Sequence, residues 1–276
     1  MLPAIDFVRL TLGALLALIA AVAGYWGKAL RLSGAAAAFF LGTVIFGLGG
    51  FTWALLLLTF FASSSLLSLL FKKRKALMEE NYEKGSTRDA FQVLANGGLA
   101  GIMVILQWLF PASVIPWLAA SAALAAANAD TWATEIGIFG KGDPVLITTG
   151  KRVPKGTSGA ISLVGTLASL AGSALVAAVF WIFSPAGTAI LPLPALAGLV
   201  VVSGLAGSLV DSLLGASLQA GYTCPTCQKA TEKHPLHSCG TPTLYQRGIR
   251  WLNNDWVNFF CTLGAALTAM GLYFLF

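Results

Sequence analysis

The sequence predicts an all-α fold, a polytopic helical membrane protein with about eight transmembrane helices and both termini outside. Three observations predict it. Hydrophobic residues make up 57% of the 276-residue chain, and the mean hydropathy is +0.80. Only 10% of the residues are charged, whereas an ordinary soluble domain carries about 25%. Apolar stretches recur at roughly the 20 residues that a bilayer requires. A soluble globular protein is therefore excluded.

The apolar stretches predict eight spans in a single transmembrane domain that occupies residues 1–276. Gly49 and Gly50 separate the second span from the third, and prolines such as Pro111 and Pro192 punctuate the later boundaries. The expected spans lie at 7–25, 32–50, 51–71, 91–110, 114–137, 157–183, 193–218 and 253–275.

The basic residues predict the orientation in the membrane. The chain carries 17 Lys and Arg against 11 Asp and Glu, a net charge of +6. Lys and Arg gather between spans one and two, three and four, five and six, and seven and eight, whereas the intervening loops contain none. This alternation is typical of cytoplasmic loops on one side. The charge therefore indicates orientation rather than a nucleic-acid partner, and only Arg9 lies on the side predicted to be outside.

A polar stretch ends the fifth expected span. After the apolar run from Trp117 to Ala127, the chain continues Asn128-Ala129-Asp130-Thr131-Trp132-Ala133-Thr134-Glu135. A carboxylate beside hydrocarbon costs a few kcal/mol, which makes both acids candidates for function. On a helix, Asn128, Thr131 and Glu135 share a face, and Asp130 lies on a neighbouring face. The alternative is a helix end whose polar side chains reach water.

Four more polar clusters are expected on the same cytoplasmic side. They are Arg88, Gln92 and Asn96 at the fourth span, Lys155-Gly156-Thr157-Ser158-Gly159 at the sixth, Asp211 in the seventh, and Asn253-Asn254-Asp255 at the eighth. The glycine turn before the sixth span is expected to offer backbone N–H groups to an anion, since a helix begins there. Stripes of Ser, Thr and Gly within the sixth and seventh spans are interpreted as helix packing.

The acids at this face predict a magnesium site. Asp130, Glu135, Asp211 and Asp255 would repel one another if they converged without a cation. Mg²⁺ binds carboxylate oxygens together with water and substrate phosphates. The basic residues nearby suit phosphate oxygens.

A Cys/His loop is expected on the cytoplasmic side at 219–250. Cys224 and Cys227 form a C-x-x-C pair, and either His237 with Cys239 or His234 with Cys239 could complete a tetrahedral site. A cytoplasmic thiol cluster more often binds metal than forms disulfides. One interpretation is a structural Zn²⁺ site formed by Cys224, Cys227, His237 and Cys239; a redox dithiol and a loop of no special chemistry are the alternatives.

Four stretches together resemble a family of integral membrane proteins whose best-known plant member is phytyl-phosphate kinase. They are Arg88 to Gly98, Ala129 to Gly137, Gly156 to Ser162, and Gly207 to Ser212 with Asn253 to Asn258. The resemblance covers nearly the whole chain, and it implies kinship with the CTP-dependent phytol and dolichol kinases and the CDP-archaeol synthases. The Cys/His loop is not shared by all members, which argues against a universal catalytic role for it.

The resemblance implies transfer of a phosphoryl group from a nucleoside triphosphate, CTP by analogy, to an isoprenyl monophosphate at the cytoplasmic membrane face. Asp130, Asp211 and Asp255 are the expected Mg²⁺ ligands, and Glu135 is expected to be a further ligand or to orient one. The residues expected to bind nucleotide and phosphate are Arg88, Gln92, Asn96, Asn128, Thr131, Lys151, Lys155, Gly156, Thr157, Ser158, Asn253 and Asn254.

Two other functions fit the same residues. A transporter or flippase of an anionic lipid phosphate also carries acids at one depth and helices broken by glycine. It should offer polar groups on a path to both faces, whereas here the outer halves of the spans are nearly free of charge. A cytidylyltransferase that forms a CDP-lipid would use the same groups with attack on the α-phosphate.

Overall fold

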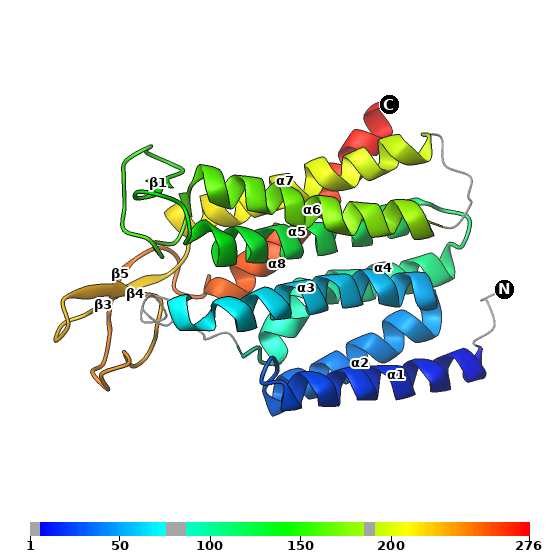
Figure 1. Cartoon of the computed structure of the whole chain (residues 1–276), viewed down its shortest axis with the longest axis horizontal. Coiled ribbons are helices and arrows are strands. Elements are labelled where there is room, and N and C mark those ends of the chain that lie inside the picture. The colour runs from blue at the N-terminus through cyan, green and yellow to red at the C-terminus, as the bar shows by residue number, and fades with distance from the viewer. Residues whose placement is uncertain (1–5, 76–86, 185–190) are drawn as a thin grey trace.

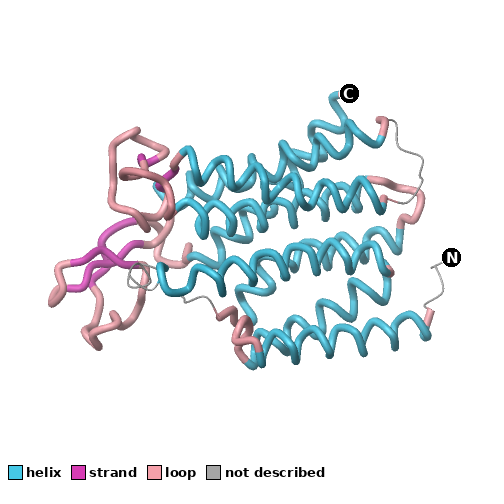
Figure 2. The backbone as a smooth tube through the Cα atoms, viewed as in Figure 1, coloured by secondary structure: helices cyan, strands magenta, loops and turns pink. Residues whose placement is uncertain are grey.

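The computed structural model describes residues 6–75, 87–184 and 191–276, without the side chains of 72–75. These residues form eight α-helices and five short strands, and the helices run side by side in one bundle (Figures 1 and 2). The helices are α1 (Phe7–Trp26), α2 (Leu32–Gly49), α3 (Phe51–Lys75), α4 (Ala90–Leu109), α5 (Ile115–Gly137), α6 (Leu163–Phe183), α7 (Leu193–Ser217) and α8 (Asn254–Leu275). The all-α prediction is confirmed. Lys84 and the side chains of 72–75, part of one predicted basic loop, lie outside the described residues.

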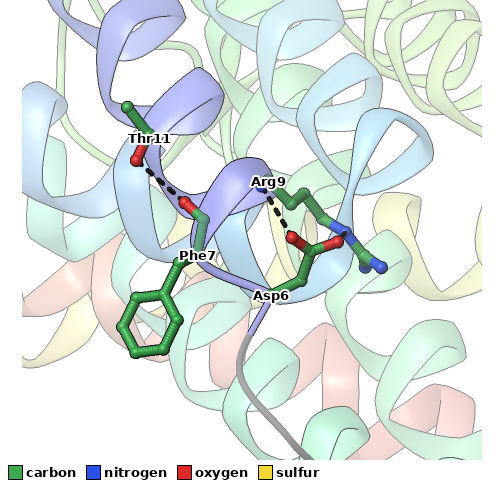
Figure 3. Close-up of polar contacts among 4 residues, drawn as sticks. All are labelled: Asp6, Phe7, Arg9 and Thr11. Carbon is green, nitrogen blue, oxygen red and sulfur yellow. Dashed lines mark hydrogen bonds and ion pairs between the residues drawn. The ribbon is translucent and has the colours of Figure 1, made fainter.

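The N-terminus of α1 explains the one basic residue on the side predicted to be outside. The Asp6 carboxylate accepts a hydrogen bond of 3.0 Å from the backbone N–H of Arg9 and so caps the helix. Its other oxygen lies 3.7 Å from Arg9 Nε, and the Thr11 hydroxyl bonds the Phe7 carbonyl one turn on (Figure 3). Because Asp6 offsets the Arg9 charge, this end of the chain adds little net positive charge.

Helix α5 is the centre of the bundle. It packs against α3, α4, α6, α7 and α8, and every residue from Pro116 to Ala129 is buried. Alanine dominates this stretch because a small side chain lets neighbouring helices approach closely. Seven of the described helices are long and apolar enough to cross a membrane, and α5 is not among them. Since α5 faces protein instead of lipid, it can carry polar residues without exposing them to hydrocarbon.

Small residues also set the contact between α7 and its neighbours. A Cβ added at Gly207 would lie 2.6 Å from Ala126 Cβ and 2.7 Å from the Cys261 carbonyl oxygen. A Cβ added at Gly204 would collide with Ser173 of α6. The glycines of the seventh span therefore serve close packing, in agreement with the interpretation of its small-residue stripe.

Two small sheets lie at one end of the bundle. Strands β1 (Val145–Leu146) and β2 (Ala160–Ile161) pair antiparallel between α5 and α6, and β4 (Lys229–Thr231), β3 (Gly221–Cys224) and β5 (Leu244–Arg247) form an antiparallel sheet between α7 and α8. The start of α1 and the end of α8 lie at the opposite end (Figure 1). These two helix ends thus lie at the same end of the bundle; the side of the membrane on which the termini lie stays a prediction.

Two helix boundaries decide where polar groups lie. Gly50 has φ +76°, a left-handed conformation that separates α2 from α3 at the expected glycine pair. Helix α6 begins at Leu163, with Ser162 as its N-cap, so the expectation of a helix from residue 157 is wrong. The intervening residues form a turn and then strand β2, because Gly156 and Gly159, at φ +83° and +78°, cannot continue a right-handed helix.

Candidate functional site

A polar cavity of about 250 Å³ lies where α4, α6 and α8 begin and α5 and α7 end. Each of these helix ends is at the end of the bundle that carries the two sheets (Figure 2). The acidic and basic residues that line the cavity are Asp130, Glu135, Asp211, Glu232, Arg88 and Lys155. Three of them lie on α5 and α7 and three lie on the connecting segments, so the cavity brings together parts that are far apart in the sequence.

Two acids of the cavity come from α5 and α7 and lie near each other. Asp130 and Asp211 both line the cavity, and Asp130 and Glu232 are near enough to Asp211 to act on it electrostatically. Among the described residues, Asp211 Oδ2 is buried without a hydrogen-bond partner. A buried polar atom without a partner is rare and indicates a bound ion or water. The arrangement therefore favours a cation between these carboxylates.

Glu135 contributes differently. Its side chain is only 1% exposed, and its Oε1 accepts a hydrogen bond of 2.7 Å from the Ser68 hydroxyl of α3. Arg88 is near enough to interact electrostatically with it. A buried carboxylate needs such a donor and such a cation. Glu135 thus interacts electrostatically with Arg88, and both residues line the cavity.

The main chain and a phenyl ring hold Arg88 in place. Its backbone N–H donates to the Ala29 carbonyl at 2.9 Å, and its carbonyl accepts from the Arg31 N–H at 2.8 Å. Its guanidinium donates to Ser65 at 3.2 Å and lies 5.4 Å from the Phe60 ring centre. Burial lowers the pKa of Arg88 to about 10, partly opposed by Glu135. The side chain therefore remains a positioned cation at neutral pH, suited to phosphate.

Helix α4 begins beside Arg88, and its residues Gln92 and Asn96 also line the cavity. The Asp89 carboxylate accepts from the Gln92 N–H at 3.1 Å, and the Gln92 side chain accepts from the Asp89 N–H at 3.1 Å, which makes a capping box. Asn96 follows one turn later and donates to the Gln92 carbonyl at 2.9 Å. The predicted stripe of Arg88, Gln92 and Asn96 therefore reaches the cavity.

The Cys/His loop forms a compact cluster. One ligand atom each from Cys224, Cys227, His237 and Cys239 lies within 4.8 Å of every other. His234 instead stacks on Tyr222, with ring centres 4.5 Å apart, which selects His237 from the two expected pairings. Hydrogen bonds with Thr241 and His237 lower the pKa of the Cys239 thiol to about 5. The Cys227 thiol has its pKa raised to about 11, mainly by its hydrogen bond with Cys239.

Comparison with known proteins identifies the family. The family described as integral membrane protein DUF92 matches residues 15–266 of the chain. The chain belongs to the DUF92 family. It is accordingly an integral, multi-pass membrane protein, and the resemblance read from its motifs is confirmed.

The relatives span plants and archaea. Protein PGR of Arabidopsis thaliana is 32% identical over 91% of this chain and 91% of its own length. Protein VTE6, chloroplastic, of the same plant is 29% identical over 83% of this chain and 61% of its own length. An uncharacterized membrane protein of Methanocaldococcus jannaschii is 36% identical over 64% of this chain and 69% of its own length. No solved structure matches the chain.

The two lysines expected to hold phosphate, Lys151 and Lys155, are not free to do so in this DUF92 protein: one lies outside the cavity lining and the other bonds backbone carbonyls. Lys155 Nζ donates to the carbonyls of Ile138 at 3.0 Å and Gly140 at 2.7 Å, which follow the last residue of α5. Lys155 lines the cavity, but its ammonium is largely committed to these carbonyls, where a cation is favoured. Lys151 is exposed and does not line the cavity. Phosphate binding by Lys151 is therefore not supported.

The turn before α6 lines the cavity with Gly156, Thr157 and Ser158, but not as a helix N-terminus. The Thr157 N–H and hydroxyl both donate to the Pro154 carbonyl, at 3.2 and 2.7 Å. The Ser158 hydroxyl donates to Gln219 at 2.7 Å. The expectation that the Thr157 N–H caps a phosphate is therefore corrected, because the turn itself uses that group.

Two asparagines expected at the site stabilise helices. Asn128 is fully buried; its side-chain oxygen accepts from Ser63 and Ser64 at 2.8 and 3.0 Å, and its nitrogen donates to the Gly172 carbonyl at 2.8 Å. It links α3, α5 and α6 outside the cavity lining. Asn253 caps α8 by accepting from the Trp256 N–H at 3.3 Å. Neither position supports the predicted contact with substrate. Thr131, by contrast, lines the cavity.

Asp255 also departs from the prediction. Asn254 and Asn258, one helical turn apart on α8, line the cavity, whereas Asp255 does not. Successive helical residues are rotated by about 100°, so the side chain after Asn254 points elsewhere. Asp255 is 9% exposed and lies in the first turn of α8, where the helix dipole favours a carboxylate. Its predicted role as a metal ligand is therefore not supported by its position.

Sequence reasoning missed several residues of the cavity, among them Glu232 and Ser68. Glu232 lies on the loop between Cys227 and His237, and no helical periodicity connects it with α7. Ser68 is one of several serines on α3, and only its contact with Glu135 distinguishes it. An acid between two pairs of metal-ligand residues is the one sequence signal that could have selected Glu232.

Proposed function

We propose that this cavity transfers the γ-phosphoryl group of a nucleoside triphosphate, CTP in particular, to an isoprenyl monophosphate. The observation that carries the proposal is the convergence of Asp130 and Asp211, with the unpartnered Asp211 Oδ2, in a cavity that also contains Arg88. Acids that hold Mg²⁺ and a fixed cation that holds phosphate are the main requirements of phosphoryl transfer. The motif resemblance supplies the lipid class and the nucleotide.

The residues fit a magnesium ion. Asp130 and Asp211 would hold it, with Glu232 as the third acid nearby. Mg²⁺ prefers carboxylate oxygens and water, and it neutralises phosphate charge when bound. Without such a cation the three carboxylates would repel one another.

The chain's own groups account for the transfer. An oxygen of the isoprenyl monophosphate attacks the γ-phosphorus, the bond from that phosphorus to the β-phosphate oxygen breaks, and the nucleoside diphosphate leaves with the electron pair. The acceptor oxygen is already anionic at neutral pH, so no general base is required. Arg88, oriented by Glu135 and Ser65, holds phosphate oxygens, and Asn96, Asn254 and Asn258 offer amides to the nucleotide or phosphate.

The cavity wall formed by α7 suits a lipid substrate. Leu205 and Leu209 line the cavity beside Ser208 and Asp211. Leu209 is 38% exposed on the surface of a helix apolar enough to cross the membrane. An isoprenoid tail can therefore remain in lipid along α7 while its phosphate lies among the polar groups.

The packing of α5 disfavours a transport path. From Trp117 to Ala127 the centre of the bundle is filled by residues no more than 2% exposed. A transporter needs polar groups toward both faces, and this stretch provides mainly alanine. Cytidylyl transfer uses the same residues and is separated from kinase chemistry only by the phosphorus attacked.

Purified protein in lipid nanodiscs, with Mg²⁺, geranylgeranyl or phytyl monophosphate and CTP labelled at either the α- or the γ-phosphorus, tests the proposal. The expected result is γ-label in the lipid diphosphate and release of CDP. Asp211→Asn should lower turnover by about 10²–10³-fold, whereas Asp143→Asn, in an exposed loop, should not. Transfer of α-label would establish cytidylyl transfer instead, and no nucleotide consumption with CTP or ATP would refute both.

A further inference from the structure

We propose that Cys224, Cys227, His237 and Cys239 bind one structural Zn²⁺, and that this ion holds Glu232 in the wall of the cavity. The ligand atoms of the four residues all lie within 4.8 Å of one another. Tetrahedral Zn²⁺ with Zn–S bonds of about 2.3 Å separates two sulfurs by about 3.8 Å. Cys224 Sγ and Cys239 Sγ are 3.6 Å apart. Three thiols and one imidazole make a Cys₃His set, a common closed site of structural zinc.

The backbone shapes the ligands into two turns. At the first, the Cys227 N–H donates to Cys224 Sγ at 3.4 Å and the Gln228 N–H donates to the Cys224 carbonyl at 2.9 Å. At the second, the Gly240 N–H donates to the His237 carbonyl at 2.9 Å, with Gly240 at φ +81°. The N–H contact to Cys224 Sγ and the two turns orient the ligands before metal binds.

Polar contacts join the ligand atoms to one another and to Thr241. Cys239 Sγ lies 3.2 Å from His237 Nδ1 and 3.3 Å from the Thr241 hydroxyl. His237 is 5% exposed, and its Nε2 is buried without a hydrogen-bond partner among the described residues. Burial of an imidazole beside three thiols indicates a ligand, because these side chains otherwise gain little from being gathered.

Hydrogen bonds connect the Cys/His loop to the end of α7. Arg247 of β5 donates to the carbonyls of Ala216 and Gly215, at 2.8 and 3.1 Å, at the end of α7. The Ile249 N–H donates to the Leu218 carbonyl at 2.8 Å, and the Ala220 N–H to the Leu252 carbonyl at 2.9 Å. The sheet that carries the cluster therefore has a defined position over the end of α7.

Glu232 lies between the two ligand pairs in the sequence and lines the cavity in the fold. Its neighbour Lys233 donates to Ser238 at 2.7 Å, next to Cys239, and the Lys233 carbonyl accepts from Thr243 at 3.0 Å. A metal that joins Cys227 to His237 closes the chain segment that carries Glu232. The ion thus acts on the cavity through the position of Glu232.

Metal analysis of the full-length protein, purified in detergent without chelator, tests the site. One zinc per chain is expected. Cys227→Ser and Cys239→Ser should each lower the zinc content severalfold, whereas Cys261→Ser, a buried thiol of α8, should retain it. Glu232→Gln should also retain it. Absence of zinc, a disulfide among the three loop cysteines, iron in its place, or full zinc content in the Cys227→Ser/Cys239→Ser double variant would overturn the proposal.

Hydrogen–deuterium exchange tests the positioning of Glu232. Removal of zinc by a chelator should raise exchange in residues 221–247 by about tenfold or more and leave α5 unchanged. Unchanged exchange in the loop would refute the positioning role. Both measurements need no nucleotide, so a protein that binds zinc but transfers no phosphate would refute the proposed function and leave this inference intact.

Discussion

The Ser68 hydroxyl of α3 donates a hydrogen bond of 2.7 Å to the Glu135 carboxylate of α5. This contact joins two helices at the cavity and gives a nearly fully buried acid one of its donors. Arg88 supplies the charge on the same side. The Ser68–Glu135 contact therefore connects the packing of α3 on α5 with the orientation of Arg88, the cation proposed to hold phosphate.

Ser68→Ala is expected to destabilise the protein by about 1–3 kcal/mol, because it removes a donor from a buried carboxylate. Thermal unfolding in detergent, followed by tryptophan fluorescence, measures the change. Thr59→Ala on the same helix is the control, since the Thr59 hydroxyl bonds only its own helix at Leu55 among the described contacts. Equal effects of the two substitutions would contradict a special role for the Ser68–Glu135 contact.

Asn128→Ala is expected to cost roughly 2–3 kcal/mol of stability and to leave the affinity for nucleotide unchanged. The reason is that the amide bonds Ser63, Ser64 and Gly172 outside the cavity. Unfolding temperature and nucleotide titration separate the two effects. A stable variant with weakened nucleotide binding would restore the contact with substrate predicted from the sequence.

Asp130→Asn and Asp211→Asn are each expected to lower phosphoryl transfer by about 10²–10³-fold, whereas Asp255→Asn should have a much smaller effect. Only the first two acids line the cavity. Turnover at saturating Mg²⁺, normalised to folded protein, gives the comparison. If Asp255→Asn abolished turnover in a well-folded protein, the assignment of the metal ligands would have to include α8.

Lys151→Ala and Lys155→Ala are expected to differ. Lys151 is exposed away from the cavity, so its removal should change neither stability nor turnover appreciably. Lys155 donates to the carbonyls that follow α5, so its removal should destabilise the protein by about 1–2 kcal/mol. Unfolding temperature and turnover of each variant check this. A turnover defect in Lys151→Ala would show that the loop reaches the phosphates.

Much of the architecture could be predicted because the bilayer imposes a simple rule. An apolar run of fixed length must be a helix, and loop charges alternate with topology. Seven of the eight expected spans therefore match the observed helices to within a few residues, and α6 fails only at its start. There, Gly156 and Gly159 adopt positive φ, which turns the chain into a loop that no hydropathy pattern distinguishes.

The residue types of the site could be predicted from the sequence better than the directions in which their side chains point. Helical spacing placed Arg88, Gln92 and Asn96 on one stripe, and all three line the cavity. Asn128 and Glu135 were expected on one face, yet Asn128 bonds α3 and α6 while Glu135 lies at the cavity. Periodicity states which residues of one helix are neighbours, but not which neighbouring helix each of them meets.

The sequence by itself determined the membrane class, the helix order, the family and the set of chemically active residues, since composition, apolar length and motif spacing are local properties of the chain. Only the tertiary structure decided which of those residues share the cavity. It brought Glu232 to Asp211, selected His237 over His234, and turned Asp255 away from the lining. The physical reason is that the packing of small side chains around α5 sets the rotation of each helix, and that rotation decides which acids can meet at one cation.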